Sequence, residues 1–310
     1  MKAASLTFTI ALALTAGAAR AATTFDYNLF VLGDMTASGS DVEGRVAVRG
    51  NANLGGYSVG LKAPAGDNLV VGRNFTAIGG STSGNVVAGG SINTWSYGFG
   101  GSKTANATTL PVDFAAESTR LSNLSTTLKG YSANGSTEYK WGQLFFTGTS
   151  DTLNVFTVTA DQMRNSNTFH VNVKNGSQVL FNISGANAAM QYAGFDLVGV
   201  DASKILYNFH DATSLSFSGI GVQGSVLATK AAYNGGYGNV DGQMIVGSFN
   251  GPTQINYKLY SGTLLNYAPA TPTPPGAGAI PEASTWAQMI AGFGLLGGAL
   301  RRRRSALRTA

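Results

Sequence analysis

The chain has 310 residues, of which 42 are Gly, 8 are Pro and none is Cys, and only 11% are charged. This length allows one large or two small domains, and the composition excludes a collagen, a disulfide-stabilised scaffold and a disordered polyelectrolyte. Because Gly is about twice as frequent as in average proteins, we expect short strands joined by many tight turns rather than long helices.

The first 21 residues have the pattern of a secretory signal. Lys2 precedes an apolar stretch from Leu6 to Ala19, and a site of small residues ends at Ala21. The apolar stretch is shorter than the roughly 20 residues that a membrane-spanning helix needs. We therefore predict export, with cleavage by a signal peptidase between Ala21 and Ala22. A short transmembrane anchor is the alternative.

A short motif recurs near both ends of the body of the chain. It reads VEGRVAV at 42–48, VQGSVLA at 222–228 and VDGQMIV at 240–246, with a weaker copy, GNVVA, at 84–88. Alternate apolar residues line one face of a strand, and we expect the preceding Gly at a corner where a side chain would collide with the neighbouring coil. Since the copies flank a middle region that lacks the motif, we predict one domain closed by its two ends.

A second repeat has the spacing of stacked coils. The segments VAVRGN at 46–51, LVVGRN at 69–74 and NVVAGG at 85–90 are offset by 23 and 16 residues, and the motif copies at 222 and 240 are 18 apart. Offsets of this size fit a parallel β-solenoid, in which each coil buries its apolar face by stacking on the next. The sequence therefore predicts an all-β fold of this type, and an antiparallel β-sandwich is the alternative.

One substantial helix is expected between residues 111 and 130. Pro111 can start it and Gly130 can end it. Its apolar residues share one face at helical spacing, so we expect it to lie against the solenoid. The apolar residues of this face are Phe114, Leu121, Leu124 and Leu128. Four β-strands are predicted after the helix, at 143–146, 152–158, 168–173 and 178–183.

Few residues could support catalysis or bind a metal. With no Cys, the two His residues, His170 and His210, are too few for a zinc site, and the acidic residues between 34 and 43 lack the spacing of a calcium loop. Asp211 could orient His210 as in a catalytic triad, but no Gly-x-Ser-x-Gly elbow occurs. The alternating Ser residues that follow are typical of the solvent-exposed side of a strand. The sequence predicts no enzyme, no metal site and no cofactor.

Binding has better support than catalysis. Aromatic residues lie among Gly, Asn and Ser in two segments, 91–100 and 231–239. Aromatic rings with small polar neighbours suit carbohydrate or protein surfaces. Packing of these rings over an end of the solenoid is the alternative. The candidate contact residues are Trp95, Tyr97, Tyr233 and Tyr237.

The end of the chain has a different organisation from the body, which we place at 22–267. A Pro-rich linker follows at 268–279, where no core can form. Residues 280–304 then contain the segment PEASTW, an uncharged apolar stretch at 286–300 and four consecutive Arg, and 305–310 is a basic tail. Such an apolar segment enters the bilayer while the Arg cluster stays on the cytoplasmic side.

This tripartite end resembles the PEP-CTERM sorting signal of Gram-negative bacteria, which an exosortase-type transpeptidase cuts near its Pro-Glu-Pro. Pro281 and Glu282 match the signal, whereas Ala283 stands at its third position. The resemblance implies processing at Pro281 and Glu282 and transient anchoring in the inner membrane. A plain C-terminal membrane anchor is the alternative.

The two ends also carry the positive charge. The whole chain has a formal net charge of +5, but 7 of its 20 basic and only one of its 15 acidic residues lie in the ends, which leaves 13 basic and 14 acidic residues in the body. Nucleic-acid binding needs basic charge clustered on the folded domain. A nucleic-acid partner is therefore not expected.

Four separated segments of the body match one bacterial family in sequence and in order. They are YNLFVLGD at 27–34, DVEGRVAV at 41–48, ILYNFHDAT at 205–213 and GSVLA at 224–228. Together they resemble the choice-of-anchor A domain, whose members carry different C-terminal sorting signals. The resemblance implies an exported surface or matrix protein with a β-rich fold similar to ice-binding and collagen-adhesion modules. It supplies no catalytic residues.

The leading functional hypothesis is an exported adhesive or structural component of the surface, matrix or biofilm of a Gram-negative bacterium, which binds an exopolysaccharide or a surface protein non-covalently. A secreted polysaccharide hydrolase that uses Glu43, Asp211 or His210 is the first alternative. An ice-binding protein is the second. It needs a regular Thr-rich face, and Thr residues such as Thr147 and Thr149 do not have solenoid spacing.

Overall fold

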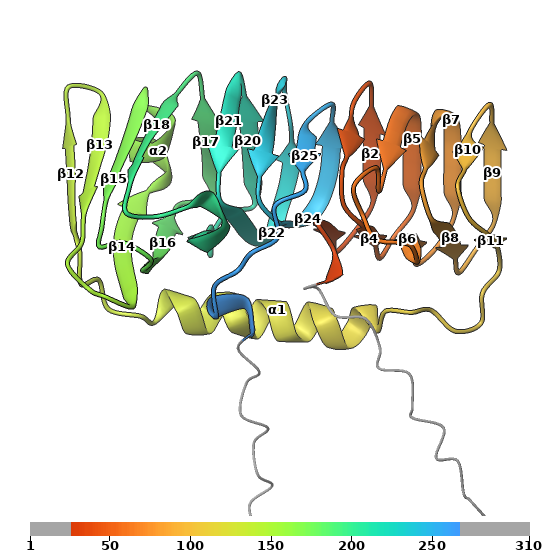
Figure 1. The fold of residues 1–310 in the computed structure, drawn as a ribbon, viewed down its shortest axis with the longest axis horizontal. Coiled ribbons are helices and arrows are strands. Elements are labelled where there is room, and N and C mark those ends of the chain that lie inside the picture. Colours follow the sequence, from red (N-terminus) through yellow and green to blue (C-terminus); the bar gives the residue numbers. More distant parts are fainter. Residues whose placement is uncertain (1–25, 267–310) are drawn as a thin grey trace, which may run out of the picture. The chain divides into compact units, whose positions relative to one another are not determined.

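The computed structural model describes residues 26–266, which form a parallel β-solenoid with one helix alongside (Figure 1). The predicted processing residues Ala21, Ala22, Pro281 and Glu282, the linker and the apolar segment at 286–300 lie outside the described residues. Within residues 26–266, none of the helices combines the length and the apolar character needed to cross a membrane.

Three stacks of strands form three faces. The first, which we call the helix face, contains β14 (Leu153–Thr159), β16 (Gln178–Ser184), β19 (Ile205–Asn208), the first parts of β22 (Ser225–Asn234) and β24 (Met244–Gly251), β1 (Leu29–Val31), β4 (Val46–Val48), β6 (Asp67–Val71), β8 (Asn85–Ala88) and β11 (Lys103–Thr104).

The second stack, the ladder face, contains β17 (Asn187–Gln191), β20 (Ser214–Ser218), the second parts of β22 and β24, β2 (Met35–Ser38), the first parts of β5 (Ala52–Val59) and β7 (Phe75–Thr82), and β9 (Ile92–Trp95). The third, the charged face, contains β21 (Ile220–Gln223), β23 (Gly238–Asp241), β25 (Gln254–Asn256), β3 (Asp41–Val42), the second parts of β5 and β7, and β10 (Gly98–Phe99). A four-stranded sheet continues it: β12 (Ser136–Lys140), β13 (Gln143–Thr147), β15 (Thr168–Asn172) and β18 (Gly194–Val198).

The order of the coils along the solenoid differs from their order in the sequence. Residues 29–104 build one half, from the middle of the solenoid to one end, and α1 (Phe114–Lys129) then runs back along the helix face (Figure 1). Residues 136–256 build the other half, from the opposite end towards the first coil. The halves meet where β24 pairs with β1 and β2, and where β25 pairs with β3. The prediction of one solenoid domain closed by its two ends is confirmed.

The strand registers confirm the sequence repeats with one correction. The two motif copies that are 18 residues apart pair as predicted, and Val46 pairs with Leu69. The next coil was expected to place Asn85 beside Leu69, but Val86 lies there. An irregularity between Asp67 and Leu69 shifts the register by one residue. Because side chains alternate between the two sides of a strand, this shift is what keeps Val86 inside the core.

The Gly of the recurrent motif lies at a corner, as predicted. A Cβ atom on Gly242 would collide with the carbonyl group of Gly224 in the neighbouring coil, and a Cβ atom on Gly44 would collide with the side chain of Asn28. No larger residue fits at either corner unless the neighbouring coil shifts.

Aromatic rings fill the interior of the half built by residues 136–256. Their centroids lie between 4.6 and 6.5 Å apart from ring to ring. The buried hydroxyl of Tyr207 donates a hydrogen bond to the carbonyl oxygen of Gln223. This polar group therefore has a hydrogen-bond partner inside the core. The rings of this stack are Phe146, Phe156, Phe181, Tyr207, Phe209, Phe217, Tyr233 and Phe249.

The helix α1 has the buried face that the sequence predicts. Its residues Phe114, Leu121, Leu124 and Leu128 are buried, and they share one apolar cluster with outward-facing residues of the helix face, which include Phe30, Val70, Leu180, Leu206, Leu227 and Ile245. Asp113 rather than Pro111 caps the helix, because its carboxylate accepts the first backbone N–H groups, and Gly130 ends it. The four strands predicted after it are confirmed as β13 to β16. The other helices of the described residues are short: α2 (Ala160–Arg164) and 3₁₀ turns at Ala202–Lys204 and Leu264–Asn266.

A buried Asn side chain ties the two halves together. Nδ2 of Asn28 donates to the carbonyl oxygens of Gly242 at 2.9 Å and Asn256 at 3.1 Å, and its Oδ1 accepts the N–H of Gly44 at 3.1 Å. Gly242 and Asn256 belong to the C-terminal half, whereas Gly44 belongs to the N-terminal half. Two hydrogen bonds of this side chain therefore cross the junction, and the third fixes the side chain within its own half.

We expect Asn28→Ala to lower the free energy of unfolding by about 3 kcal/mol, because each buried polar group left unpaired costs about 1–3 kcal/mol. Denaturant unfolding of the full chain measures this loss. The control is Asn93→Ala, which truncates an exposed Asn on β9. A similar small effect in both variants would show that Asn28 does not hold the junction.

Candidate functional site

The ladder face carries no charge. Inward residues such as Leu54 and Phe75 are buried, while the outward residues are small or polar except for Ile78 and Trp95. Asp, Glu, Lys, Arg and His are absent from all the strand segments that form it: 35–38, 52–55, 75–78, 92–95, 187–191, 214–218, 231–234 and 247–251. The result is a regular, neutral surface.

A single column of Asn and Thr crosses six neighbouring coils of the ladder face. All six side chains are exposed. Neighbouring coils lie about 4.8 Å apart, so the column presents an amide or a hydroxyl group at that interval. The Asn/Thr column consists of Asn234, Asn250, Thr36, Asn53, Thr76 and Asn93, aligned in that order by the strand registers.

Part of the column is open to a ligand. Nδ2 of Asn250 donates to Oδ1 of Asn234 at 3.1 Å, a bond between neighbouring coils. Among residues 26–266, by contrast, the side chains of Thr36, Asn53 and Thr76 have no hydrogen-bond partner. Their donors and acceptors are therefore free to bond a molecule that lies on the face.

Side chains at the corner before the ladder face fix its register. Oδ1 of Asp34 accepts the N–H of Asn51 at 2.6 Å, Oδ1 of Asn51 accepts that of Asn74 at 3.3 Å, and Oδ1 of Asn74 accepts that of Ser91 at 3.0 Å. Each bond joins one coil to the next at the same corner. Four of the strands that carry the Asn/Thr column, β2, β5, β7 and β9, therefore start from a fixed point.

Two of the four predicted contact residues are exposed. Trp95 is 76% exposed and lies on the ladder face beside Ile78, its register partner, which is 64% exposed. Tyr237 is 83% exposed and lies in the turn before β23. These two side chains are accessible to a ligand.

Tyr233 cannot be a surface contact residue. Its ring is fully buried between Phe217 and Phe249, and its hydroxyl lies 2.8 Å from Oγ1 of Thr253. The physical reason is strand alternation, because Tyr233 pairs in register with the inward-facing Leu215.

Tyr97 packs over the end of the solenoid, which is the alternative that the sequence left open. Its ring contacts Phe75 and Phe99 edge-on, and its hydroxyl lies 2.7 Å from Oγ1 of Thr82. Burial raises the pKa of Tyr97 to about 12. This residue therefore closes the hydrophobic core at β10 and is only partly accessible.

Two exposed rings were not predicted from the sequence. Trp141, which is 82% exposed, lies in the turn between β12 and β13, and Tyr192, which is 75% exposed, follows β17. The pair Trp141-Gly142 between two β-prone segments is a turn signal that could have located the first ring. Nothing in the local sequence marks Tyr192.

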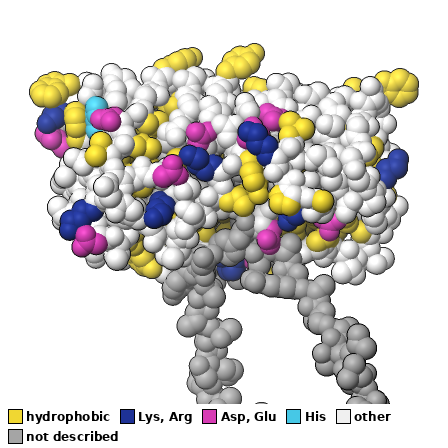
Figure 2. Space-filling model, in the orientation of Figure 1, with side chains coloured by type: hydrophobic (Ala, Val, Ile, Leu, Met, Phe, Trp, Pro, Cys, Tyr) yellow, Lys and Arg dark blue, Asp and Glu magenta, His cyan; other side chains and the backbone are white. Residues whose placement is uncertain are grey.

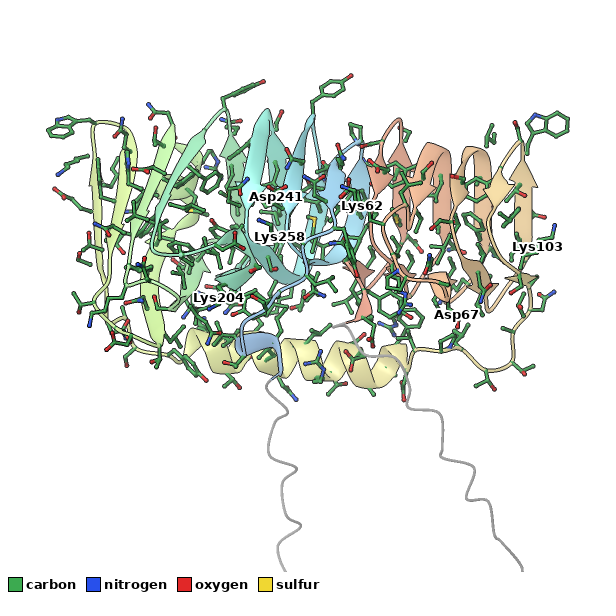
Figure 3. All side chains as sticks on the ribbon, in the orientation of Figure 1. Lys62, Asp67, Lys103, Lys204, Asp241 and Lys258 are labelled. Carbon is green, nitrogen blue, oxygen red and sulfur yellow. The ribbon has the colours of Figure 1, made fainter. Side chains whose placement is uncertain are left out.

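Charged side chains gather on the charged face. Figure 2 shows Lys and Arg interspersed there with Asp and Glu. In Figure 3, Lys62, Asp241 and Lys258 come from three different segments of this face. Oε1 of Glu43 lies 2.7 Å from Nζ of Lys62, and Oε2 accepts the N–H of Tyr257 at 2.8 Å. Burial alone would raise the pKa of Glu43, but these two bonds outweigh it and lower the pKa.

The residues considered for hydrolysis have separate partners. Glu43 pairs with Lys62, whereas Asp211 pairs with Lys129 of α1 at 3.2 Å and lies 3.1 Å from Nδ1 of His210. Residues 26–266 contain no group of three or more side chains placed to hold a metal ion.

Glu43→Gln should lower the melting temperature at pH 7, and the difference from the native chain should shrink in acid. Because the pKa of Glu43 is lower in the folded than in the unfolded chain, its contribution is complete above the unfolded pKa of about 4 and is lost as the pH falls through the folded pKa. Thermal unfolding between pH 7 and pH 3 tests this. Glu138→Gln, in an exposed pair with Lys140, should change little at any pH. A pH-independent effect of Glu43→Gln would contradict the assignment.

The sequence of the β-solenoid matches a family model. Residues 21–257 match the family described as "Putative Ice-binding-like adhesive domain". Neither the curated proteins nor the solved structures include a significant match to the chain. Because the family match covers well over half of the 310 residues, the chain belongs to the ice-binding-like adhesive domain family.

Proposed function

We propose that this chain is an adhesive component of the cell surface or extracellular matrix, and that its ladder face binds a polysaccharide or a surface protein non-covalently. The observation that carries the proposal is the Asn/Thr column on an uncharged face. A row of amides and hydroxyls at a constant interval can bond a repeating ligand at many points, so that weak contacts add up. Membership in an adhesive domain family supports it.

Binding occurs without turnover in this proposal. Hydrolysis of a glycosidic bond by two carboxylates needs a pair that converges across a cleft. The carboxylate of Glu43 is engaged by Lys62 and by the N–H of Tyr257, and that of Asp211 by Lys129. These arrangements support a structural role for both residues.

The route to the surface that we propose is that of an exported Gram-negative protein. The N-terminal signal pattern supports cleavage after Ala21 by a signal peptidase, and the PEP-CTERM-like end supports processing near Pro281 and Glu282 by an exosortase-type transpeptidase after transient anchoring in the inner membrane. The resemblance of four body segments to the choice-of-anchor A domain fits this route.

Thr76→Lys should weaken binding to the producer's extracellular polysaccharide or washed cells about tenfold. It places an unpaired charge on the ladder face, and this charge must lose its water when the ligand binds. Thr76 lies within the column, between Asn53 and Asn93. The bound fraction of the full chain in a pull-down, measured over a range of ligand concentrations, gives the change in affinity. Released sugar is measured in the same samples.

The matched control is Asn123→Lys, which adds the same charge to an exposed position of α1. It should bind like the native chain. Equal losses in both variants would contradict binding through the ladder face, and release of sugar would contradict binding without turnover.

Ice binding is a second candidate, favoured by the same column. Thr36 and Thr76 lie two coils apart on the ladder face, with Asn53 between them. Thr147 and Thr149, whose irregular spacing spoke against this function, lie at the end of β13 and after it, outside the ladder face. Their spacing therefore says nothing about the regular face.

An ice-binding chain should produce thermal hysteresis, a gap between the freezing and melting temperatures of a solution that contains ice crystals. Thr76→Lys should abolish the gap and Asn123→Lys should preserve it. If the native chain shows no gap but binds matrix polysaccharide, ice binding is wrong and adhesion stands.

A further inference from the structure

The corner between the ladder face and the charged face forms a row of stacked turns, which we call the edge row. In the N-terminal half, the strand registers align four positions of this row, all with positive φ: Gly39, Gly56, Gly79 and Ser96. In Figure 1 these turns run along the side of the solenoid opposite α1, and Figure 2 shows hydrophobic side chains projecting from that side at intervals. The rest of the row includes larger residues.

Two exposed Tyr rings lie two coils apart on the edge row. The register of β17 and β20 places Tyr192 beside Gly219, and the register of β21 and β23 places Gly219 beside Tyr237. The backbone bonds from Tyr192 N–H to the carbonyl oxygen of Ser218 and from Gly219 N–H to that of Tyr237 confirm the stacking. At about 4.8 Å per coil, the two Tyr positions are about 10 Å apart.

Trp141 continues the row at the same interval. The registers align Gln143 of β13 with Thr168 of β15 and Gly194 of β18. Trp141, in the hairpin turn between β12 and β13, and Tyr192 each lie two residues before an aligned position, two coils apart. The backbone bonds from Asn167 N–H to the carbonyl oxygen of Gly142 and from Gly194 N–H to that of Asn167 stack these turns. The row therefore presents three aromatic residues at two-coil intervals, with exposed fractions of 82% for Trp141, 75% for Tyr192 and 83% for Tyr237.

Two of these rings occupy strained backbone positions. Trp141 has φ +53° and Tyr192 has φ +48°, whereas the other half of the row uses Gly at most of its corners. The left-handed region is unfavourable for bulky L-residues, and such strain persists mainly at functional sites. A Cβ atom on Gly219 would collide with the ring of Tyr192, so this ring lies across the next coil. The fold therefore keeps the backbone of Trp141 and Tyr192 in a strained conformation, and both rings are exposed there.

The chemistry of the row suits a neutral sugar chain. Aromatic rings stack on the apolar faces of sugar rings, and the hydroxyls of Tyr192 and Tyr237 have no partner among residues 26–266. Nζ of Lys140, 5.1 Å from the Trp141 ring centroid, is paired with Glu138 at 2.9 Å. In an extended β-(1→4)-linked glycan every second sugar presents the same face, and its two-sugar repeat is close to the interval of two coils.

We propose that Trp141, Tyr192 and Tyr237 form a stacking site for an extended, neutral β-(1→4)-linked glycan that lies along the edge row. Successive rings of the row stack on alternate sugars of the glycan, one ring to each two-sugar repeat. The site is separate from the Asn/Thr column and goes beyond the proposed adhesion by naming a ligand class and its contacts.

Calorimetric titration of the full chain with hexamers of β-(1→4)-linked glucose and N-acetylglucosamine tests the site, with the α-(1→4)-linked glucose hexamer as the control ligand. A hexamer contains three two-sugar repeats, one for each ring. We expect binding of a β-linked hexamer and none of the α-linked one. Tyr192→Gly should weaken binding about tenfold, the loss of one stacking contact. It should leave the melting temperature unchanged or higher, because Gly relieves the left-handed strain.

Trp95→Ala is the matched control, since it removes an exposed ring from the ladder face in the other half of the solenoid. It should keep the affinity for the hexamer. No binding of either β-linked hexamer, or equal affinity of Tyr192→Gly and the native chain, would overturn the proposal. If the native chain still bound matrix polysaccharide through Thr76, the stacking site alone would be wrong.

Discussion

The parallel pairing of β24 with β1 and β2 is the contact on which the rest of the structure depends. It joins two halves of the chain, and the Asn28 side chain bonds across it to Gly242, 214 residues away. Separated halves would each expose an unpaired strand edge, and α1 would have no continuous face to cover. The Asn/Thr column crosses the same junction between Asn250 and Thr36, so it exists as a continuous row only when the halves are joined.

The three faces differ in what the fold requires of them. Outward residues of the helix face must be apolar, because α1 covers them. No such constraint applies to the ladder face, where outward residues meet solvent and a solenoid tolerates charge. Charges are nevertheless confined to other surfaces, where most form pairs such as Glu43 with Lys62 and Asp201 with Lys258. Folding does not explain a neutral face across eight strands, whereas the adhesion that we propose, to a neutral, repeating surface, does.

The sequence could predict the coils and the helix, because both depend on local patterns: Gly44 before alternating Val residues, and Leu121 and Leu124 on one helical face. It could not separate Tyr233, which is buried, from Trp95, which is exposed, because a shift of one residue in a strand exchanges its two sides. The edge row depends on which turns stack, which is a property of the registers between distant segments. The neutral column was missed for the same reason.

Hydroxyl-radical footprinting of the full chain, free and bound to matrix polysaccharide, tests the assignment of the ladder face most directly. The exposed hydrophobic residues serve as reporters of each surface: Ile78 and Trp95 for the ladder face, Leu61 and Tyr257 beside Glu43 for the charged face. We expect the ligand to protect Ile78 and Trp95 from oxidation and to leave the oxidation of Leu61 and Tyr257 unchanged. Protection of Leu61 and Tyr257, with Ile78 and Trp95 oxidised as in the free chain, would contradict it.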